Sequence, residues 1–273
     1  MDLSISVVNY NTKNLVKQFV KNCATQTAGL SYEIIITDNG STDGSVDFIK
    51  KEILSRYPEV RLIQEKNRGF GAGLNRGLRE STGEFMLIAN PDLVILDGAL
   101  QELCRFLRED PKRGIVAPKL IYPDLTVQKS CSAWPSLLTP LYRRTGFGKT
   151  VPGKRDLARY ELANYDKKSP QRVDWAVGAC LLIRRETWDA VHGFDERYFL
   201  YCEDIDICKN AWSRGYEVWY NPRAKMIHFH KRLSAQKKWW QFIFNKTVRI
   251  HIASHIKYMR KWGGKNGHKK LNH

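Results

Sequence analysis

Three acidic residues, Glu203, Asp204 and Asp206, lie within four positions at the predicted start of a helix. The aromatic residues that precede them are Phe194, Tyr198, Phe199 and Tyr201. Acidic side chains are favoured in a first helical turn because they face the positive end of the helix dipole, so a stabilised helix start is one interpretation. The other is a general base, because a fixed carboxylate can accept a proton from a substrate hydroxyl.

A second acidic position, Asp92, belongs to the tripeptide Asn90-Pro91-Asp92. Residues 84–90 are almost wholly apolar, which predicts a strand buried on both faces, and Pro91 must end it. Asp92 would then stand at the carboxyl edge of a sheet, where ligands of α/β proteins collect. The tripeptide is also ordinary turn chemistry. One carboxylate for a metal and another for a proton are what metal-assisted group transfer requires.

The elements that would position these acids alternate along the first third of the chain. Strands are predicted at residues 3–9, 33–38 and 60–64, and helices at 12–26, at about 45–56 and after the glycine-rich segment 67–73. Such alternation predicts an α/β fold with a parallel, doubly wound sheet. The loops at the strand ends are polar or glycine-rich, so a backbone can approach a phosphate closely there. Neither the dinucleotide fingerprint nor a phosphate-binding loop is present, so a dehydrogenase or kinase-type fold is poorly supported.

Six motifs in this order resemble the family 2 glycosyltransferases, with most similarity to bacterial rhamnosyltransferase-like members, over residues 3–234. They are Ser6-Val-Val-Asn-Tyr10, Ile36-Thr-Asp-Asn-Gly-Ser-Thr-Asp-Gly-Ser45, Asn67-Arg-Gly-Phe-Gly-Ala-Gly-Leu-Asn75, Asn90-Pro-Asp92, Trp175-Ala-Val-Gly-Ala-Cys180 and Gly193-Phe-Asp-Glu-Arg-Tyr-Phe-Leu-Tyr-Cys-Glu-Asp204. The resemblance implies the GT-A fold, a Rossmann-like, mostly parallel sheet flanked by helices. It also implies a divalent metal, Mg²⁺ or Mn²⁺, and inversion at the anomeric carbon of the sugar.

The same resemblance implies roles for individual residues. Asp204 matches the catalytic base, with Glu203 as its neighbour. Asp92 stands where the metal-binding acid of the family's Asp-X-Asp motif stands. Asn90 replaces the first acid of that motif, so a single carboxylate is available for the metal.

The resemblance also predicts the donor site. Asp38 would contact the nucleotide base, with Asn9 and Tyr10 beside it and Arg68 near the base or the phosphates. A second segment would line the region of the acceptor and the donor sugar; its residues are Trp175, Gly178 and Ala179. The donor would be a dTDP- or UDP-sugar, and Asp38 could accept a hydrogen bond from the N–H of its pyrimidine ring.

Two histidines, His228 and His230, follow a predicted strand at 216–220. Alternate residues of a strand point to opposite faces, so at most one of them should reach the site. In the family a late histidine often completes the metal or diphosphate site, and His228 best matches that position. A structural histidine is the other interpretation.

Composition limits the remaining possibilities. The chain has 273 residues and 42% hydrophobic residues, enough for one α/β unit with an appendage. Its six cysteines lack Cys-X-X-Cys spacing, which favours buried thiols in a cytoplasmic protein. No signal peptide and no membrane-spanning apolar run are expected. Residues 123–170, rich in Pro, Lys and Arg, are expected to form a variable loop over the acceptor side. The oligomeric state is left open.

The net charge of +17 is concentrated near the C-terminus, since fourteen lysines and arginines and no acidic residue follow Glu217. We expect a catalytic domain at 1–234 and a basic amphipathic helical tail at 235–273. The apolar face of that helix would hold Trp240, Phe244, Val248, Ile252 and Met259, with Trp239 and Phe242 at its flank. The basic face would hold Lys246, Arg249, Lys257 and Arg260. Such a helix is typical of binding to an anionic membrane surface, and the alternative is a helix packed on the catalytic domain. No nucleic-acid recognition module accompanies it.

Three functional classes follow. The first is an inverting, metal-dependent glycosyltransferase at the cytoplasmic face of a bacterial membrane. It would move a sugar, such as L-rhamnose from dTDP-rhamnose, to a saccharide or a polyprenyl-diphosphate-linked saccharide for cell-surface polysaccharide. The second is a sugar nucleotidyltransferase, but residues 9–13 lack the glycines that it should carry after the first strand. The third is a non-catalytic saccharide- or membrane-binding module, disfavoured by the presence of both Asp92 and Asp204.

Overall fold

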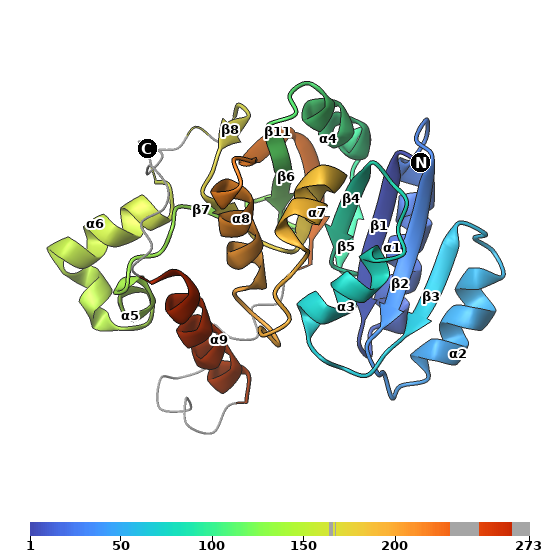
Figure 1. The fold of residues 1–273 in the computed structure, drawn as a ribbon, viewed down its shortest axis with the longest axis horizontal. Helices are drawn as coiled ribbons and strands as arrows, with labels where there is room; N and C mark the ends of the chain where they lie inside the picture. The colour runs from blue at the N-terminus through green and yellow to red at the C-terminus, as the bar shows by residue number, and fades with distance from the viewer. Residues whose placement is uncertain (164–165, 167, 230–245, 264–273) are drawn as a thin grey trace.

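A computed structural model of the chain describes residues 1–163, 166, 168–229 and 246–263, and a large mixed β-sheet forms its centre (Figure 1). The strands run in the order β3-β2-β1-β4-β10-β6-β11-β5, and β8 pairs with β11. Their bounds are β1 Leu3–Asn9, β2 Tyr32–Asp38, β3 Val60–Gln64, β4 Phe85–Ala89, β5 Leu93–Ile95, β6 Arg113–Ile121, β8 Gln171–Arg172, β10 Cys180–Arg184 and β11 Glu217–His228. A second, small sheet pairs β7, Cys131–Ser132, with β9, Trp175–Ala176.

Strand direction divides the large sheet into two parts. Strands β1 to β4 are mutually parallel, as the alternation of predicted strands and helices indicated. Strand β10 then lies antiparallel between β4 and β6. Beyond it, β11 is parallel to β6 and antiparallel to β5. The predicted α/β class is confirmed; the sheet is wholly parallel from β3 to β4 and mixed from β10 onward.

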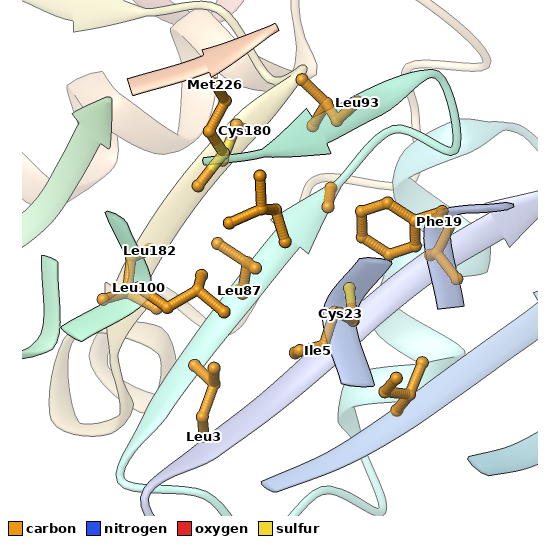
Figure 2. Close-up of a cluster of buried hydrophobic side chains, with 14 of the residues drawn as sticks. Leu3, Ile5, Phe19, Cys23, Leu87, Leu93, Leu100, Cys180, Leu182 and Met226 are labelled. Atoms are coloured by element: carbon orange, nitrogen blue, oxygen red, sulfur yellow. The ribbon is translucent and has the colours of Figure 1, made fainter. Parts of the chain in front are cut away.

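Helices cover both faces of the sheet. Their bounds are α1 Lys13–Gln26, α2 Ser45–Ile49, α3 Phe70–Leu78, α4 Ala99–Arg108, α5 Thr139–Arg144, α6 Val151–Tyr160, α7 Arg185–Val191, α8 Glu203–Ser213 and α9 Lys246–Trp262, with the short helical turns η1 Lys50–Leu54 and η2 Gly146–Lys149. In β4, Leu87 belongs to the cluster with α1 and α4, shown in Figure 2, and Ile88 to the cluster with α3, α7 and α8. Strands covered on both faces need apolar residues at every position, which explains the unbroken apolar runs.

Strand pairing gathers residues that are distant in sequence at one edge of the sheet. Asn9 pairs with Asp38 at the carboxyl ends of β1 and β2. Ala89, the last residue of β4, pairs with Cys180, the first residue of β10. His228, the last residue of β11, pairs with Leu93. This edge therefore holds most of the residues predicted to act.

The expectation of a loop over residues 123–170 is wrong for its described part, because α5, η2 and α6 form there. Pro140 occupies the first turn of α5, and Thr150 caps α6 by accepting a hydrogen bond from Gly153 N. Proline and threonine are favoured at these positions because the first N–H groups of a helix have no partner within it. The helices are short, with at least four residues of each exposed or half-exposed, so their apolar periodicity is weak.

The predicted C-terminal helix is present as α9, but its buried face differs from the predicted one. Val248 is buried as expected, whereas Ile252 is 44% exposed. The buried side instead includes Ser254 and Tyr258, and it packs against the loop before α8. Trp239, Trp240, Phe242, Phe244 and the predicted boundary after residue 234 lie outside the described residues.

Candidate active site

Asn9 and Asp38 form a buried polar corner where β1 and β2 end. Asn9 Nδ2 donates to Asp38 Oδ2 at 2.6 Å and to Ser41 Oγ at 3.0 Å. Asp38 Oδ1 accepts the backbone N–H of Ser41 at 3.0 Å. One carboxylate oxygen of Asp38 thus holds the loop after β2 in place, and the other accepts from Asn9 at the end of β1. Contact with a nucleotide base, which would use a second lone pair, remains a prediction.

Tyr10 and Arg68, which are also predicted to bind the nucleotide, are more exposed than Asn9 and Asp38. Tyr10, directly after Asn9, is 52% exposed. Arg68 borders a surface cavity of about 120 Å³ that Asn39 also lines. Its guanidinium lies 3.8 Å from a carboxylate oxygen of Glu65. The structure therefore places Arg68 near the residue that follows Asp38, with a side chain accessible to a ligand.

Asp92 and His228 meet as the sequence predicted. Strand β5 starts directly after Asp92 and pairs with the end of β11, and Phe229 N donates to Asp92 O at 3.0 Å. This pairing leaves His228 Nε2 3.4 Å from Asp92 Oδ1. Asp92 Oδ1 is buried and accepts no hydrogen bond from the described residues. His230 lies outside the described part of the chain.

Gln128 orients His228, and sequence reasoning missed it because it falls in the segment expected to be a loop. Its Nε2 donates to His228 O at 2.8 Å, so its Oε1 faces His228 Nδ1, at 2.9 Å. The oxygen can only accept a hydrogen bond, which places a ring proton on Nδ1 and leaves Nε2 as the ring nitrogen that faces Asp92. A histidine held in this way by a neighbouring acceptor is the usual arrangement of a metal ligand.

These two side chains fit a divalent cation. Asp92 offers a carboxylate oxygen without a hydrogen bond, and His228 directs its Nε2 toward it. No group of three His, Cys, Asp or Glu side chains suited to a metal occurs within the described residues. A cation here would therefore need further oxygen ligands, such as those of a diphosphate.

The segment Gly178–Ala179 connects the predicted metal acid to the predicted base. Ala179 O accepts a hydrogen bond from Asn90 N at 2.9 Å. Gly178 N donates to Asp204 Oδ2 at 3.1 Å. Four of the predicted site residues, separated by up to 114 positions from Asn90 to Asp204, are thus joined through one short segment of chain.

Asp204 and Glu203 begin α8 as a closely coupled acidic pair. Burial raises the pKa of Asp204, while the N–H groups of Gly178 and Ile205 that it accepts oppose this rise. Burial also raises the pKa of Glu203 far above its ordinary range, and the charge of Asp204 adds to the effect. Glu203 Oε2 is buried and makes no hydrogen bond with the described residues. We assign the negative charge to Asp204 and a proton to Glu203, since Asp204 accepts the N–H groups of Gly178 and Ile205 whereas Glu203 Oε2 accepts none.

Trp175 lies on the side of Asp204 that faces the α5–α6 segment. Its indole N–H donates to Ala133 O at 3.1 Å, and its ring is 6.4 Å from that of Tyr160. Burial raises the pKa of Tyr160, and the nearby charges of Arg143, which opposes the rise, and Asp204, which adds to it, act as well. The last residue of α6 therefore borders the site, which the sequence did not indicate.

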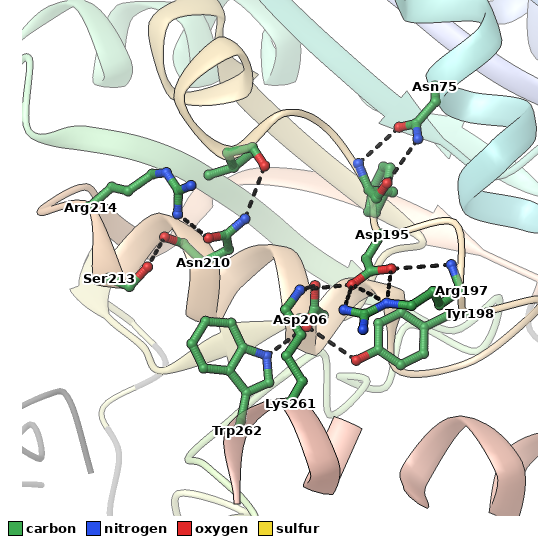
Figure 3. Close-up of polar contacts among 12 residues, drawn as sticks. Asn75, Asp195, Arg197, Tyr198, Asp206, Asn210, Ser213, Arg214, Lys261 and Trp262 are labelled. Carbon is green, nitrogen blue, oxygen red and sulfur yellow. Dashed lines mark hydrogen bonds and ion pairs between the residues drawn. The ribbon is translucent and has the colours of Figure 1, made fainter. Parts of the chain in front are cut away.

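Asp206, the third acid in the first turn of α8, is 2% exposed and is bonded to side chains of helix α9 (Figure 3). Asp206 Oδ2 contacts Lys261 Nζ at 2.7 Å, and Oδ1 accepts Trp262 Nε1–H at 2.6 Å. Tyr198 O–H donates to Oδ1 at 3.2 Å. Lys209 Nζ lies over the rings of Trp134, Tyr258 and Trp262, at 5.4 to 5.5 Å from their centroids. The first turn of α8 is thereby fastened to α9.

Comparison with known proteins shows the family to which the chain belongs. The model of the glycosyl transferase family 2 matches residues 4–162, more than half of the chain. An N-acetylglucosaminyl-diphospho-decaprenol L-rhamnosyltransferase of Mycobacterium tuberculosis strain H37Rv is 29% identical over 267 residues, covering 93% of this chain and 81% of the relative. The rhamnosyltransferase WbbL of Escherichia coli K12 is 24% identical over 270 residues, covering 94% and 92%.

Solved structures show the same fold. GalNAc-T7, crystallised with UDP, GalNAc and Mn²⁺, has a TM-score of 0.67 at 14% identity over 96% of this chain. The mannosyltransferase PcManGT of Pyrobaculum calidifontis, in complex with GDP-Man and Mn²⁺, has a TM-score of 0.60 at 19% identity over 93%. The chain spans 48% and 64% of these two chains. The fold is that of GT-A glycosyltransferases, and the family match shows that this protein belongs to glycosyl transferase family 2 and is a glycosyltransferase.

Proposed function

We propose that this protein transfers a sugar, L-rhamnose from dTDP-rhamnose, to a polyprenyl-diphosphate-linked saccharide with inversion at the anomeric carbon. The observation that carries the proposal is the Gly178–Ala179 segment, which links the base Asp204 to the Asn90–Asp92 loop. The rhamnosyltransferase activities of the Mycobacterium tuberculosis and Escherichia coli relatives support the choice of sugar. The acceptor class follows the decaprenyl-linked substrate named for the first of them.

The reaction has one covalent step. The acceptor hydroxyl oxygen forms a bond to the anomeric carbon while the bond from that carbon to the diphosphate oxygen breaks. The electron pair leaves with the nucleoside diphosphate, and the hydroxyl proton passes to Asp204. Its two N–H donors favour the ionised form of Asp204 and hold its carboxylate in a fixed direction, as a general base requires. Glu203, buried and protonated, leaves a single negative charge at the helix start.

Asp92 and His228 would hold Mg²⁺ or Mn²⁺, and the donor diphosphate would supply further oxygen ligands. When bound, such an ion offsets the charge that develops on the leaving diphosphate. Gln128 fixes the tautomer and the direction of His228 for this purpose. Asp38, with Asn9 and Tyr10, would hold the base, and Arg68 would reach the base or the phosphates.

The acceptor implies a place of action at the cytoplasmic face of the cell membrane. The described residues include no helix that could cross a bilayer. Four of the six cysteines, Cys23, Cys104, Cys180 and Cys208, are buried free thiols, which agrees with a reducing compartment. We therefore propose peripheral association with the membrane, where a polyprenyl-linked acceptor is embedded.

The test combines binding and turnover. Thermal-shift titration with dTDP, UDP, GDP and ADP in the presence of Mn²⁺ should show stabilisation by the pyrimidine nucleotides, because a ligand of the native state raises the unfolding temperature. Transfer from dTDP-rhamnose, UDP-N-acetylglucosamine and GDP-mannose to a short-chain polyprenyl-diphosphate N-acetylglucosamine is then followed by mass spectrometry. NMR of the product assigns its anomeric configuration. Equal stabilisation by GDP or ADP, or transfer with retention, would contradict the proposal.

A further inference from the structure

The chain from Leu137, two residues before α5, to Val151 at the start of α6 exposes an unusual number of large apolar side chains. We call α5, η2 and α6 together the hairpin. The five exposed side chains, which we call the hairpin tip, are Leu137 (73% exposed), Leu138 (50%), Leu141 (44%), Phe147 (60%) and Val151 (82%). Fourteen large apolar side chains are exposed in the described part of the protein, and these five fall within fifteen consecutive positions. Scattered exposed apolar residues are ordinary, whereas a concentration of them marks an interaction surface.

The tip side chains are not what holds the hairpin together. Thr139 Oγ1 donates to Asp156 Oδ2 at 2.6 Å, which ties the start of α5 to α6. A side chain at Gly148 would collide with the carbonyl of Tyr142, so η2 packs tightly on the end of α5. Figure 1 shows α5 and α6 at the end of the molecule opposite α2 and β3, away from the large sheet. The exposed residues are therefore available to a partner.

The charge of the segment indicates which partner. Residues 135–155 contain no acidic residue and five basic ones, Arg143, Arg144, Lys149, Lys154 and Arg155. The next acid, Asp156, is engaged by Thr139 and by Arg159, at 3.2 Å. Apolar side chains interspersed with cations complement the acyl chains and the anionic headgroups of a phospholipid bilayer. An acidic or neutral protein surface would match only one of these two features.

The hairpin also lies beside the site. Its final residue, Tyr160, accepts the backbone N–H of Ala133 at 3.0 Å through its carbonyl, and its ring neighbours that of Trp175. A membrane at the tip would therefore lie on the Trp175 side of Asp204, where the acceptor is expected to enter.

We propose that the hairpin tip inserts into an anionic phospholipid surface and so brings the site to its lipid-linked acceptor. This inference rests on the proposed function. The proposed membrane contact differs from the one that the sequence suggested, which was the C-terminal helix. One side of α9 already packs against the loop before α8 and is not available to a membrane. The exposed Ile252 and Ile256 of α9, with exposed fractions of 44% and 46%, are the alternative contact.

Co-sedimentation with vesicles of phosphatidylglycerol and phosphatidylcholine in equal parts tests the proposal without any donor or acceptor. Phe147→Ser/Val151→Ser should lower the partition coefficient about tenfold or more, at low and at high salt. Lys149→Glu/Lys154→Glu should lower it at low salt only, because salt screens charge. The matched control Leu15→Ser, at a leucine 38% exposed on α1, should bind like the parent protein.

Transfer to a water-soluble acceptor analogue and the thermal unfolding midpoint should be unchanged in all of these variants. Because binding is measured without substrates, a failure of the proposed reaction would not obscure the result. Normal vesicle binding by both hairpin variants would overturn the inference. So would loss of binding in Ile252→Ser/Ile256→Ser alone, or a parent protein that ignores anionic vesicles at low salt. If the serine variant misfolds, the charge variant decides.

Discussion

Gly178 and Asp204 are in direct contact: the N–H of Gly178 donates to Asp204 Oδ2 at 3.1 Å, and a Cβ at Gly178 would lie 3.1 Å from the Cβ of Asp204. That spacing is tighter than ordinary van der Waals contact. The absence of a side chain at residue 178 therefore sets how closely the carboxylate can approach the segment that also holds Asn90. The role of Gly178 is to position Asp204 as well as to line the sugar region.

Gly178→Ala should displace the carboxylate by a few tenths of an ångström. We expect kcat to fall about tenfold or more, because misplacement of a reacting group by an ångström can cost a hundredfold, while the Kd for the donor changes little. Steady-state kinetics and donor titration measure the two quantities. Gly146→Ala is the matched control, since a Cβ there meets no atom within 4 Å. An unchanged kcat in Gly178→Ala would contradict the role of Asp204 as the catalytic base.

Glu203→Gln should stabilise the protein near neutral pH. Burial raises the pKa of Glu203 in the folded chain, so between the ordinary and the raised value the folded chain keeps a proton that the unfolded chain has lost. Stability therefore falls as pH rises through this window. Denaturant unfolding should show a gain of about 1 kcal/mol or more near pH 8, at about 1.4 kcal/mol per pKa unit, and almost none near pH 4. The exposed Glu59→Gln should show neither effect.

Gln128→Leu should weaken cation binding without unfolding the protein. It removes the acceptor that holds the proton on His228 Nδ1, and loss of such a partner typically costs 10- to 100-fold in metal affinity. Electron paramagnetic resonance of Mn²⁺ in the presence of dTDP measures the affinity directly. The control is Gln101→Leu, which removes a glutamine whose Nε2 donates to two carbonyls in another part of the fold. Equal Mn²⁺ affinity in both variants would show that His228 is structural.

Lys261→Met should detach helix α9 from the rest of the protein. It leaves the carboxylate of Asp206 buried with only the neutral donors Trp262 and Tyr198, and loss of one partner of a buried pair costs about 3 kcal/mol or more. Chemical denaturation should report this loss, and kcat should fall because α8 carries Asp204. Arg260→Met, on the exposed side of the same helix, should change neither. A fully stable and active Lys261→Met protein would mean that α9 is a dispensable tail.

The sequence predicts the parallel part of the fold closely, because β1, β2 and β4 are buried along nearly their whole length and are rich in apolar residues. The strands at 3–9 and 60–64 have the predicted bounds. The insertion of β10 between β4 and β6 is a pairing between distant segments, which no local pattern encodes. Helices α5 and α6 expose their apolar residues, so the periodicity that would reveal a buried face is missing.

The candidate site could be predicted where a motif marks the end of a strand or the start of a helix. Asn9 with Asp38, Asp92 with His228, and Gly178 with Asp204 are in contact in the structure. Gln128 could not be predicted, since it reaches His228 across one hundred positions and carries no motif. The buried face of α9 was assigned wrongly because two polar residues on it, the buried Ser254 and the half-buried Lys261, find partners only in the folded chain.

The most direct test of the account compares Asp204→Asn with the parent protein in transfer from dTDP-rhamnose to a polyprenyl-diphosphate-linked acceptor. The variant keeps the size of the side chain and an oxygen for the Gly178 N–H but cannot accept the acceptor proton. Single-turnover transfer should fall about a hundredfold or more, the scale of general-base catalysis, with unchanged donor affinity and unchanged unfolding midpoint. Transfer at a near-normal rate by Asp204→Asn would contradict the assignment of Asp204 as the base.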